Sequence, residues 1–133
     1  MGHGITFICN TCDKEYNISF GEGFLSFQCD FKKILYACPE CGNWETANVD
    51  GFNHCIPEFR KEFKEMLKEN TSDFCKKIID SIEPIDLNKT CTNCGAKMKM
   101  YENLKINDKS TTPQLICKQC KSKLIYKWAY CWD

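Results

Sequence analysis

Cysteine is the residue type with the clearest capacity for chemistry in this chain, because 12 of the 133 residues are cysteines. Eight of them form Cys-x-x-Cys pairs, at positions 9/12, 38/41, 91/94 and 117/120. Random placement of this many cysteines would give only about one such pair. Two sulfurs at this spacing chelate one ion, and four thiolates complete the tetrahedral shell that Zn²⁺ accepts. The pairs therefore predict metal centres built from cysteine alone.

The four pairs fall into two groups along the chain. Twenty-five residues separate Cys12 from Cys38 and 22 separate Cys94 from Cys117, whereas 49 lie between the groups. Two pairs about twenty residues apart are typical of a zinc ribbon, a small antiparallel hairpin with a metal at one end. We therefore predict two structural Zn²⁺ ions per chain, the first bound by Cys9, Cys12, Cys38 and Cys41 and the second by Cys91, Cys94, Cys117 and Cys120.

The residue that follows each pair bears on the shape of the turn. Gly42 and Gly95 directly follow the second cysteines of two pairs. Glycine favours the left-handed backbone that points N–H groups at sulfur. Asp13 and Lys121 hold the same place in the other two pairs, where aspartate tolerates this conformation and lysine does so less readily. A redox dithiol is the alternative use of such a pair, but no βαβ pattern surrounds any of the four.

Four cysteines lie outside the pairs. Cys29 and the adjacent His54 and Cys55 could ligate a third metal, although no regular ligand spacing supports it. Cys75 lies among apolar residues and is expected to be a buried, inert thiol. Cys131, between Tyr130 and Trp132, is expected to pack rather than react.

The elements that must position the pairs are short strands and one helical stretch. Apolar or alternating segments predict strands at about 5–9, 15–20, 34–37, 44–49, 97–101, 115–117 and 123–128. Pro57 and the apolar stripe through Phe59, Phe63 and Ile82 predict one broken helix or a helix pair over about 57–83. The expected fold is α+β, with an N-terminal ribbon (1–55), a helical connector (56–88) and a C-terminal ribbon (89–133) as a weak internal repeat.

The net charge of zero hides an uneven distribution. Residues 1–55 carry −4, whereas residues 91–133 carry +5. In the C-terminal part, Lys97, Lys99 and Lys127 are interleaved with tyrosines and tryptophans, a composition found on nucleic-acid-binding faces. The single arginine, Arg60, lies outside this region, so any nucleic-acid binding by these lysines is expected to be weak and salt-sensitive. A protein partner that docks on the helical stripe is the alternative.

Several classes of protein are disfavoured by the sequence. There is no run of 18 apolar residues, so no membrane-spanning helix is expected. The chain starts without a basic segment followed by an apolar one, so no secretory signal is visible and a cytoplasmic location is expected. Twelve cysteines without export favour thiolates on metal over disulfides. No catalytic constellation or small-molecule substrate is evident, so we expect an interaction module rather than an enzyme.

Several segments resemble small bacterial proteins that contain two zinc ribbons. The resemblance rests on residues 9–12, Glu15-Tyr16, the stretch 21–25, the stretch 38–45 and the terminal Trp132-Asp133. It implies the ribbon fold and bound zinc, but no activity.

Rubredoxins provide a second resemblance, since they also use two Cys-x-x-Cys turns with nearby tyrosine and tryptophan. Tyr16, Tyr36 and Trp44 are similar to that arrangement. It implies iron in place of zinc and electron transfer in place of binding. Asp13 and Lys121 depart from the glycine that rubredoxins usually have after the pair. Spacing alone does not separate iron from zinc in a site of four sulfurs.

Overall fold

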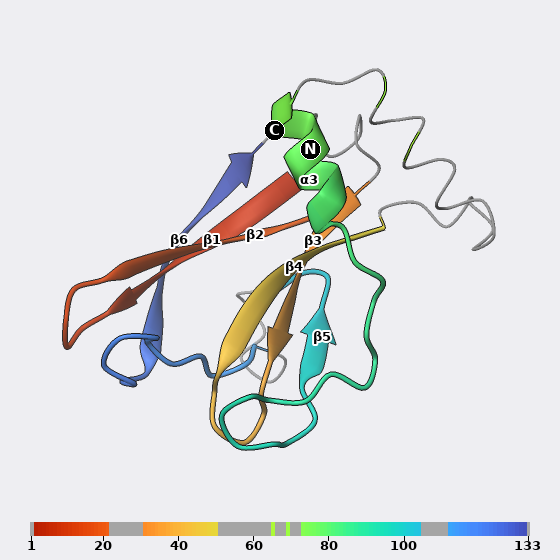
Figure 1. Ribbon diagram of the computed structural model, residues 1–133. Helices are drawn as coiled ribbons and strands as arrows, with labels where there is room; N and C mark the ends of the chain where they lie inside the picture. The colour runs from red at the N-terminus through yellow and green to blue at the C-terminus, as the bar shows by residue number, and fades with distance from the viewer. Residues whose placement is uncertain are drawn as a thin grey trace.

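The protein is built mainly from antiparallel strands. The computed structural model describes residues 2–21, 31–50, 65, 69, 73–104 and 112–132. Its strands form two three-stranded sheets, ordered β2-β1-β6 and β4-β3-β5 (Figure 1). The strand bounds are β1 (Gly2–Cys9), β2 (Glu15–Phe20), β3 (Phe31–Ala37), β4 (Trp44–Asp50), β5 (Lys99–Tyr101) and β6 (Leu124–Trp132). Helix α3 spans Asp73–Ser81.

The two sheets repeat one plan. The first contains a hairpin, β1–β2, whose turn carries the 9/12 pair, and a third strand, β6, that follows the 117/120 pair and lies beside β1. The second contains a hairpin, β3–β4, whose turn carries the 38/41 pair, and a third strand, β5, that follows the 91/94 pair and lies beside β3. The second unit is therefore inserted in sequence between the two parts of the first.

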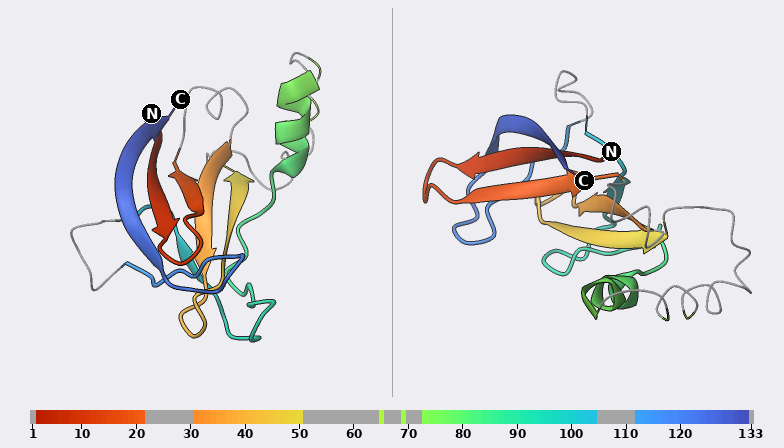
Figure 2. Two further views of the ribbon diagram at one scale, coloured as in Figure 1. Left: turned by 90° about the vertical axis from the view of Figure 1, so that its left-hand side faces the viewer. Right: turned by 90° about the horizontal axis from the view of Figure 1, so that it is seen from above.

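A shared buried core joins the sheets, whose strands β6, β1, β2, β3 and β4 follow one another side by side in the left view of Figure 2. The backbones of Gly21 and Lys33 exchange two hydrogen bonds of 3.0 Å. This bridge joins the residue after β2, in the first sheet, to β3, in the second. Gly21 has φ +77°, a conformation that few residues other than glycine adopt readily. The buried cluster combines residues of the first sheet with residues of the second, namely Ile5, Phe7, Ile18, Phe20, Leu35, Ala37 and Trp44.

The predicted α+β fold, with two successive ribbons joined by a helical segment, is wrong. Neither sheet is completed within one half of the chain, because β1 pairs with β6 from Gly2↔Trp132 to Cys9↔Leu124. Helix α3 falls in the range predicted as helical and ends before Pro84, but the rest of the stripe at 57–72 lies almost wholly outside the described residues. Among the described residues, no helix has the length and apolar character needed to cross a membrane.

Candidate metal centres

All four Cys-x-x-Cys pairs adopt the same turn. In each, the N–H of the first cysteine donates to the carbonyl five residues later, at 2.7–2.9 Å. The carbonyl of that cysteine accepts from the N–H four residues later, at 2.8–3.1 Å. The residue after the second cysteine has positive φ in every case: Asp13 +61°, Gly42 +81°, Gly95 +77° and Lys121 +64°. The turn predicted from the two glycines is thus confirmed and extends to all four pairs.

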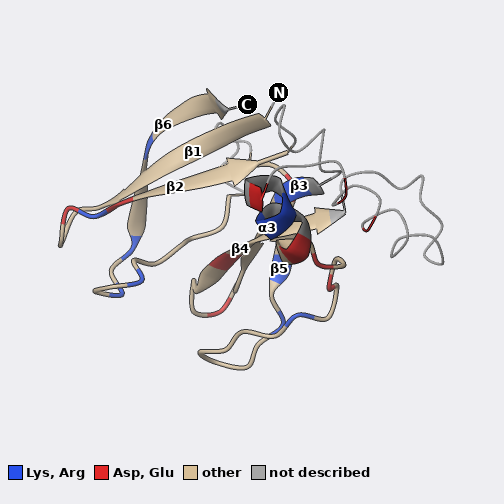
Figure 3. Cartoon of the chain, turned by 45° about the horizontal axis from the view of Figure 1, so that its top comes forward, with Lys and Arg blue, Asp and Glu red and all other residues tan. Residues whose placement is uncertain are grey.

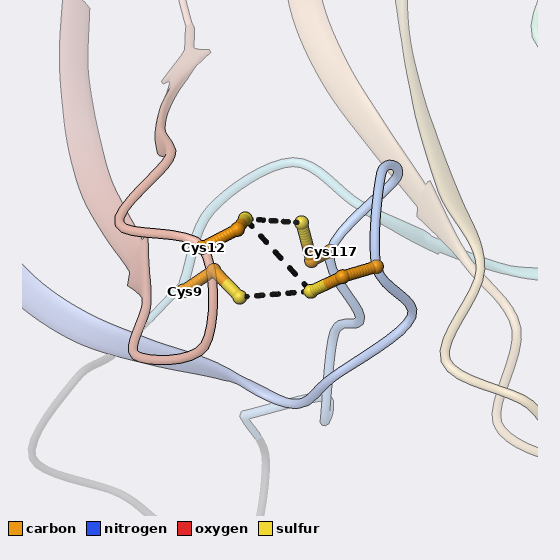
Figure 4. A group of neighbouring side chains, drawn as sticks. Cys9, Cys12 and Cys117 are labelled. Atoms are coloured by element: carbon orange, nitrogen blue, oxygen red, sulfur yellow. Dashed lines mark hydrogen bonds between the residues drawn. The ribbon is translucent and has the colours of Figure 1, made fainter.

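The eight paired cysteines gather in two groups of four. The outer centre, so named because its ligands are the first and last pairs in the sequence, consists of Cys9, Cys12, Cys117 and Cys120. The inner centre consists of Cys38, Cys41, Cys91 and Cys94. Within each group the sulfur atoms all lie within 4.8 Å of one another. Figure 4 shows Cys9 and Cys12 on one turn, facing Cys117 on a separate segment.

This grouping differs from the predicted one. The expected partners of the 9/12 pair were Cys38 and Cys41, but the structure places Cys117 and Cys120 there. The prediction chose the pairing of turns that closes the shortest loops. Loop length, however, distinguishes the successive pairing from the nested one only weakly. The nested arrangement closes loops of 104 and 49 residues instead of 25 and 22, which costs only about 2 kcal/mol more in loop entropy. The long β1–β6 ladder and the shared core offset a penalty of that size.

The sulfur spacing fits a tetrahedral ion. At the outer centre, the sulfur of Cys120 lies 3.2 Å from that of Cys9 and 3.8 Å from that of Cys12. At the inner centre, the Cys38–Cys94 and Cys41–Cys91 sulfur distances are 3.4 and 3.5 Å. A tetrahedron with metal–sulfur bonds of about 2.3 Å has edges of about 3.8 Å, whereas a disulfide requires about 2.05 Å. Both groups could therefore hold a metal ion, and neither contains a disulfide.

A tyrosine supports the outer centre. The Tyr16 hydroxyl lies 3.3 Å from the sulfur of Cys117 and accepts a hydrogen bond of 3.2 Å from the N–H of Lys118. Because its own proton then points at sulfur, the Tyr16 hydroxyl lowers the pKa of Cys117. Partial desolvation opposes this effect, and backbone N–H groups of Cys120 and Gln119 reinforce it, so that the pKa is about 6. Cys117 is therefore a thiolate at neutral pH.

The inner centre stabilises a thiolate in a different way. Burial raises the pKa of Cys91, but hydrogen bonds to its sulfur outweigh burial and lower the pKa to about 6. Among the donors are the backbone N–H of Asn93 at 3.4 Å and the Asn43 amide at 3.6 Å. Cys94 is the one exposed ligand among the eight. Solvent therefore reaches the inner centre more directly than the outer one.

One cysteine in each centre keeps its proton when metal is absent. The Lys14 backbone lowers the pKa of Cys12, but desolvation and the three neighbouring sulfurs together raise it to about 12. The Ala96 backbone likewise lowers the pKa of Cys94, and the surrounding sulfurs with desolvation raise it to about 12. Four adjacent thiols cannot all ionise without a cation between them, because like charges repel at this distance. A bound cation removes that obstacle.

The two centres are connected through Trp44 and its neighbours. The Trp44 indole donates a hydrogen bond of 2.9 Å to the carbonyl of Ile116, the residue directly before Cys117. Its ring meets Tyr16 edge-on at 5.5 Å, and the Lys118 amine lies 4.2 Å from its ring centre. Trp44 follows the inner centre's turn in sequence and packs against the outer centre in space. The sequence showed both aromatic residues near cysteines, but no pattern indicated that they lie between the two sites.

The lysines predicted as a nucleic-acid contact come from two different parts of the fold. Lys97 bridges to Thr90 just before β5, and Lys99 begins β5 in the second sheet, 5.4 Å from the ring centre of Tyr101. Lys127 lies on β6 in the first sheet, where it pairs with Glu15 and stands 4.2 Å from the ring centre of Trp128. Figure 3 shows the basic positions spread over several loops and strands.

The remaining cysteines have separate outcomes. Cys131 is exposed on β6, so its predicted packing is wrong. Cys29, His54 and Cys55, the candidates for a third metal, lie outside the described residues, and so does the side chain of Cys75. His3 stacks on Phe20 and hydrogen bonds to Asn103.

Comparisons with models of protein families, with curated proteins and with solved structures each found no match. The two groups of four cysteines agree with zinc-binding ribbons. The resemblance to bacterial double-ribbon proteins stays a prediction.

Proposed function

We propose that this protein is a non-catalytic zinc protein, with two structural Zn²⁺ ions per chain that support an interaction module. The arrangement of four sulfurs around each centre carries the proposal. Four protein ligands occupy every position of a tetrahedral ion, which leaves none for water or substrate. Metal binding by such sites supplies free energy of folding, on the order of 10–16 kcal/mol per site in small zinc-finger peptides.

Zinc is favoured because it accepts a closed tetrahedron of thiolates and needs no redox partner. A rubredoxin-like iron carrier is the second candidate. It is supported by the hydrogen bonds that reach sulfur from the Asn93 backbone and from Tyr16, since such bonds tune the potential of iron–sulfur sites. The two candidates differ in colour and in metal content.

A reducing compartment such as the cytoplasm suits the proposal. In an oxidising compartment, the closely spaced thiols of the two centres would readily form disulfides. A protein partner suits the surface better than a nucleic acid does. Lys99 and Lys127 lie on different sheets, Lys97 precedes β5, and Lys127 is engaged with Glu15. A continuous basic track, on which nucleic-acid binding usually depends, is not formed by these three residues.

Metal analysis of the purified protein tests the proposal. We expect two zinc per chain by mass spectrometry, no visible absorption, and loss of β-sheet circular dichroism after removal of zinc by a chelator. Iron with charge-transfer bands that persists after growth in zinc-supplemented medium would instead favour the electron carrier. A metal-free protein that keeps its fold and thermal transition would refute a structural role for the ions.

A further inference from the structure

Strand β6 forms an edge of the first sheet. In the order β2-β1-β6 it is the terminal strand. Its first residue, Leu124, donates its N–H to the Leu115 carbonyl at 2.9 Å, and beyond that residue β1 is its only strand neighbour among the described residues. Strand β6 is nine residues long, and edge strands of that length are normally shortened or covered because their N–H and C=O groups invite another strand. In Figure 1, β6 lies at the outside of the first sheet.

Apolar side chains are exposed on both faces of this strand. Ile125, Tyr126 and Trp128 are 47%, 42% and 48% exposed. Tyr126 lies opposite Phe7 of β1, which points into the core, whereas Trp128 lies opposite Thr6 on the other face. The register shifts between these two pairs. Because apolar groups surround the free edge on both sides, a partner would gain hydrophobic contacts as well as backbone hydrogen bonds.

The charged residues of the segment that leads into and forms β6 are all basic. Residues 112–132 contain Lys118, Lys121, Lys123 and Lys127 and no acidic residue. Lys127 pairs with Glu15 and Lys118 donates to the carbonyl of Trp44. Lys121 and Lys123 remain exposed beside the start of the strand. An occupant of this edge with acidic residues would therefore match the surface in charge.

We propose that β6 is the docking edge for an extended, acidic polypeptide segment, which adds to the sheet as a fourth strand. This rests on the proposed function as an interaction module and assigns it a partner chemistry. A second copy of the chain is the competing occupant, and a dimer that depends on Ile125 and Trp128 would identify it. A nucleic acid fits poorly, because it cannot complete the backbone ladder and gains little from Ile125.

Selection from random 12-residue peptides displayed on phage, with the zinc-loaded full chain as bait, tests the assignment. We expect enrichment of peptides that alternate β-branched and acidic residues. The best peptide should perturb backbone amide resonances of residues 124–132. Methylation of its backbone nitrogens at either the odd or the even positions should weaken binding at least tenfold, because only one set faces β6 in the ladder.

Matched variants localise the binding. Ile125→Ser with Trp128→Ser should weaken the peptide at least tenfold, whereas Ile85→Ser with Leu87→Ser, at exposed apolar residues elsewhere, should leave it unchanged. Lys123→Glu should weaken an acidic peptide, and a peptide with Lys in place of Glu should restore binding to it. Lys97 holds the equivalent position after the inner centre, so Lys97→Glu serves as the charge control.

Four outcomes would overturn the assignment. The first two are a lack of peptide enrichment and amide perturbations away from β6. The others are a 12-nucleotide oligothymidine that perturbs the same amides and binds more tightly than the peptide, and a dimer that the Ile125/Trp128 variant abolishes. Zinc content and the thermal transition are measured on the same samples. Two zinc per chain with no peptide binding would refute the docking edge alone, whereas a zinc-free folded chain would refute the proposed function.

Discussion

The backbone N–H of Ile116 donates a hydrogen bond of 3.1 Å to the carbonyl of Gly42. Gly42 directly follows Cys41 of the inner centre, and Ile116 directly precedes Cys117 of the outer centre. One peptide-to-peptide contact thus connects the ligand turns of both metal sites. A distortion placed at this contact is therefore expected to reach both ligand turns.

Gly42→Ala should weaken both centres. A Cβ at Gly42 would lie 2.8 Å from the Gln114 carbonyl oxygen and 2.9 Å from the Ile116 side chain, at φ +81°. The left-handed conformation alone costs alanine about 1–2 kcal/mol, and the clash adds to that cost. Gly95→Ala is the control, since its φ is +77° but no atom lies within 4 Å. Chelator competition should show loss at both sites for Gly42→Ala and at the inner site alone for Gly95→Ala. Equal effects of the two variants would contradict the connection.

Tyr16→Phe should weaken metal binding at the outer centre only. It removes the hydroxyl that donates to Cys117, and loss of such a ligand-supporting hydrogen bond typically lowers metal affinity about 10–100-fold. Tyr36→Phe provides the control, because that hydroxyl accepts from the Asp86 N–H and not from a ligand turn. Affinities of the two sites can be resolved by titration with Co²⁺ followed by its thiolate absorption. An unchanged outer site in Tyr16→Phe would show that the contact is incidental.

Metal affinity should rise with pH. In the metal-free protein Cys12 and Cys94, each with a pKa of about 12, are protonated at pH 7. Metal must displace those protons, so affinity should increase about tenfold per pH unit for each proton released. Cys91 and Cys117, with a pKa of about 6, are already thiolates, so fewer than four protons leave per ion at pH 7.

Below a pH of about 6 these two thiols also take up protons in the metal-free protein, so the slope of affinity against pH should steepen there. Calorimetry in buffers of different ionisation enthalpy measures the number of protons released. A release of four protons per ion at pH 7, or an affinity independent of pH, would contradict this description of the centres.

Lys121→Gly should stabilise the protein. Lys121 adopts φ +64°, where a side chain costs about 1–2 kcal/mol that glycine does not incur. Asp13→Gly should give a smaller gain, because aspartate tolerates this conformation better. After the entropy that glycine adds to the unfolded chain is subtracted, we expect a net gain below about 1 kcal/mol. Denaturant melts of the zinc-loaded variants measure it, and a destabilised Lys121→Gly protein would be the contrary result.

The eight ligands and their turn could be predicted from sequence because a Cys-x-x-Cys pair encodes local geometry. Gly42 and Gly95 marked the turn, and Asp13 and Lys121 then adopted it under the constraint of the same hydrogen bonds. The strands around the pairs were also predictable from their apolar patterns. The turns and the strands depend on residues only a few positions apart, so the local sequence determines their structure directly.

The pairing of the turns could not be predicted in that way. It depends on the contact of β1 with β6, more than one hundred residues apart in the chain, and of β3 with β5. Loop entropy separates the nested pairing from the successive one by only about 2 kcal/mol. The free energy of the long-range strand contacts decides between them, and no local sequence pattern indicates those contacts. One signal was present: the 9/12 and 38/41 pairs have predicted strands of at least four residues on both sides, whereas the predicted strand before the 117/120 pair, at 115–117, has only three. The first two pairs therefore each form their own hairpin, to which a later pair is added.

The nested arrangement of the two metal sites is tested most directly by metal retention in two double variants after dialysis against a chelator. Cys12→Ser with Cys117→Ser removes two ligands from the outer centre and leaves the inner four intact, so one zinc per chain should remain. Cys12→Ser with Cys38→Ser removes one ligand from each centre, so none should remain. One zinc retained by the Cys12/Cys38 variant and none by the Cys12/Cys117 variant would contradict the nested arrangement and restore two successive ribbons.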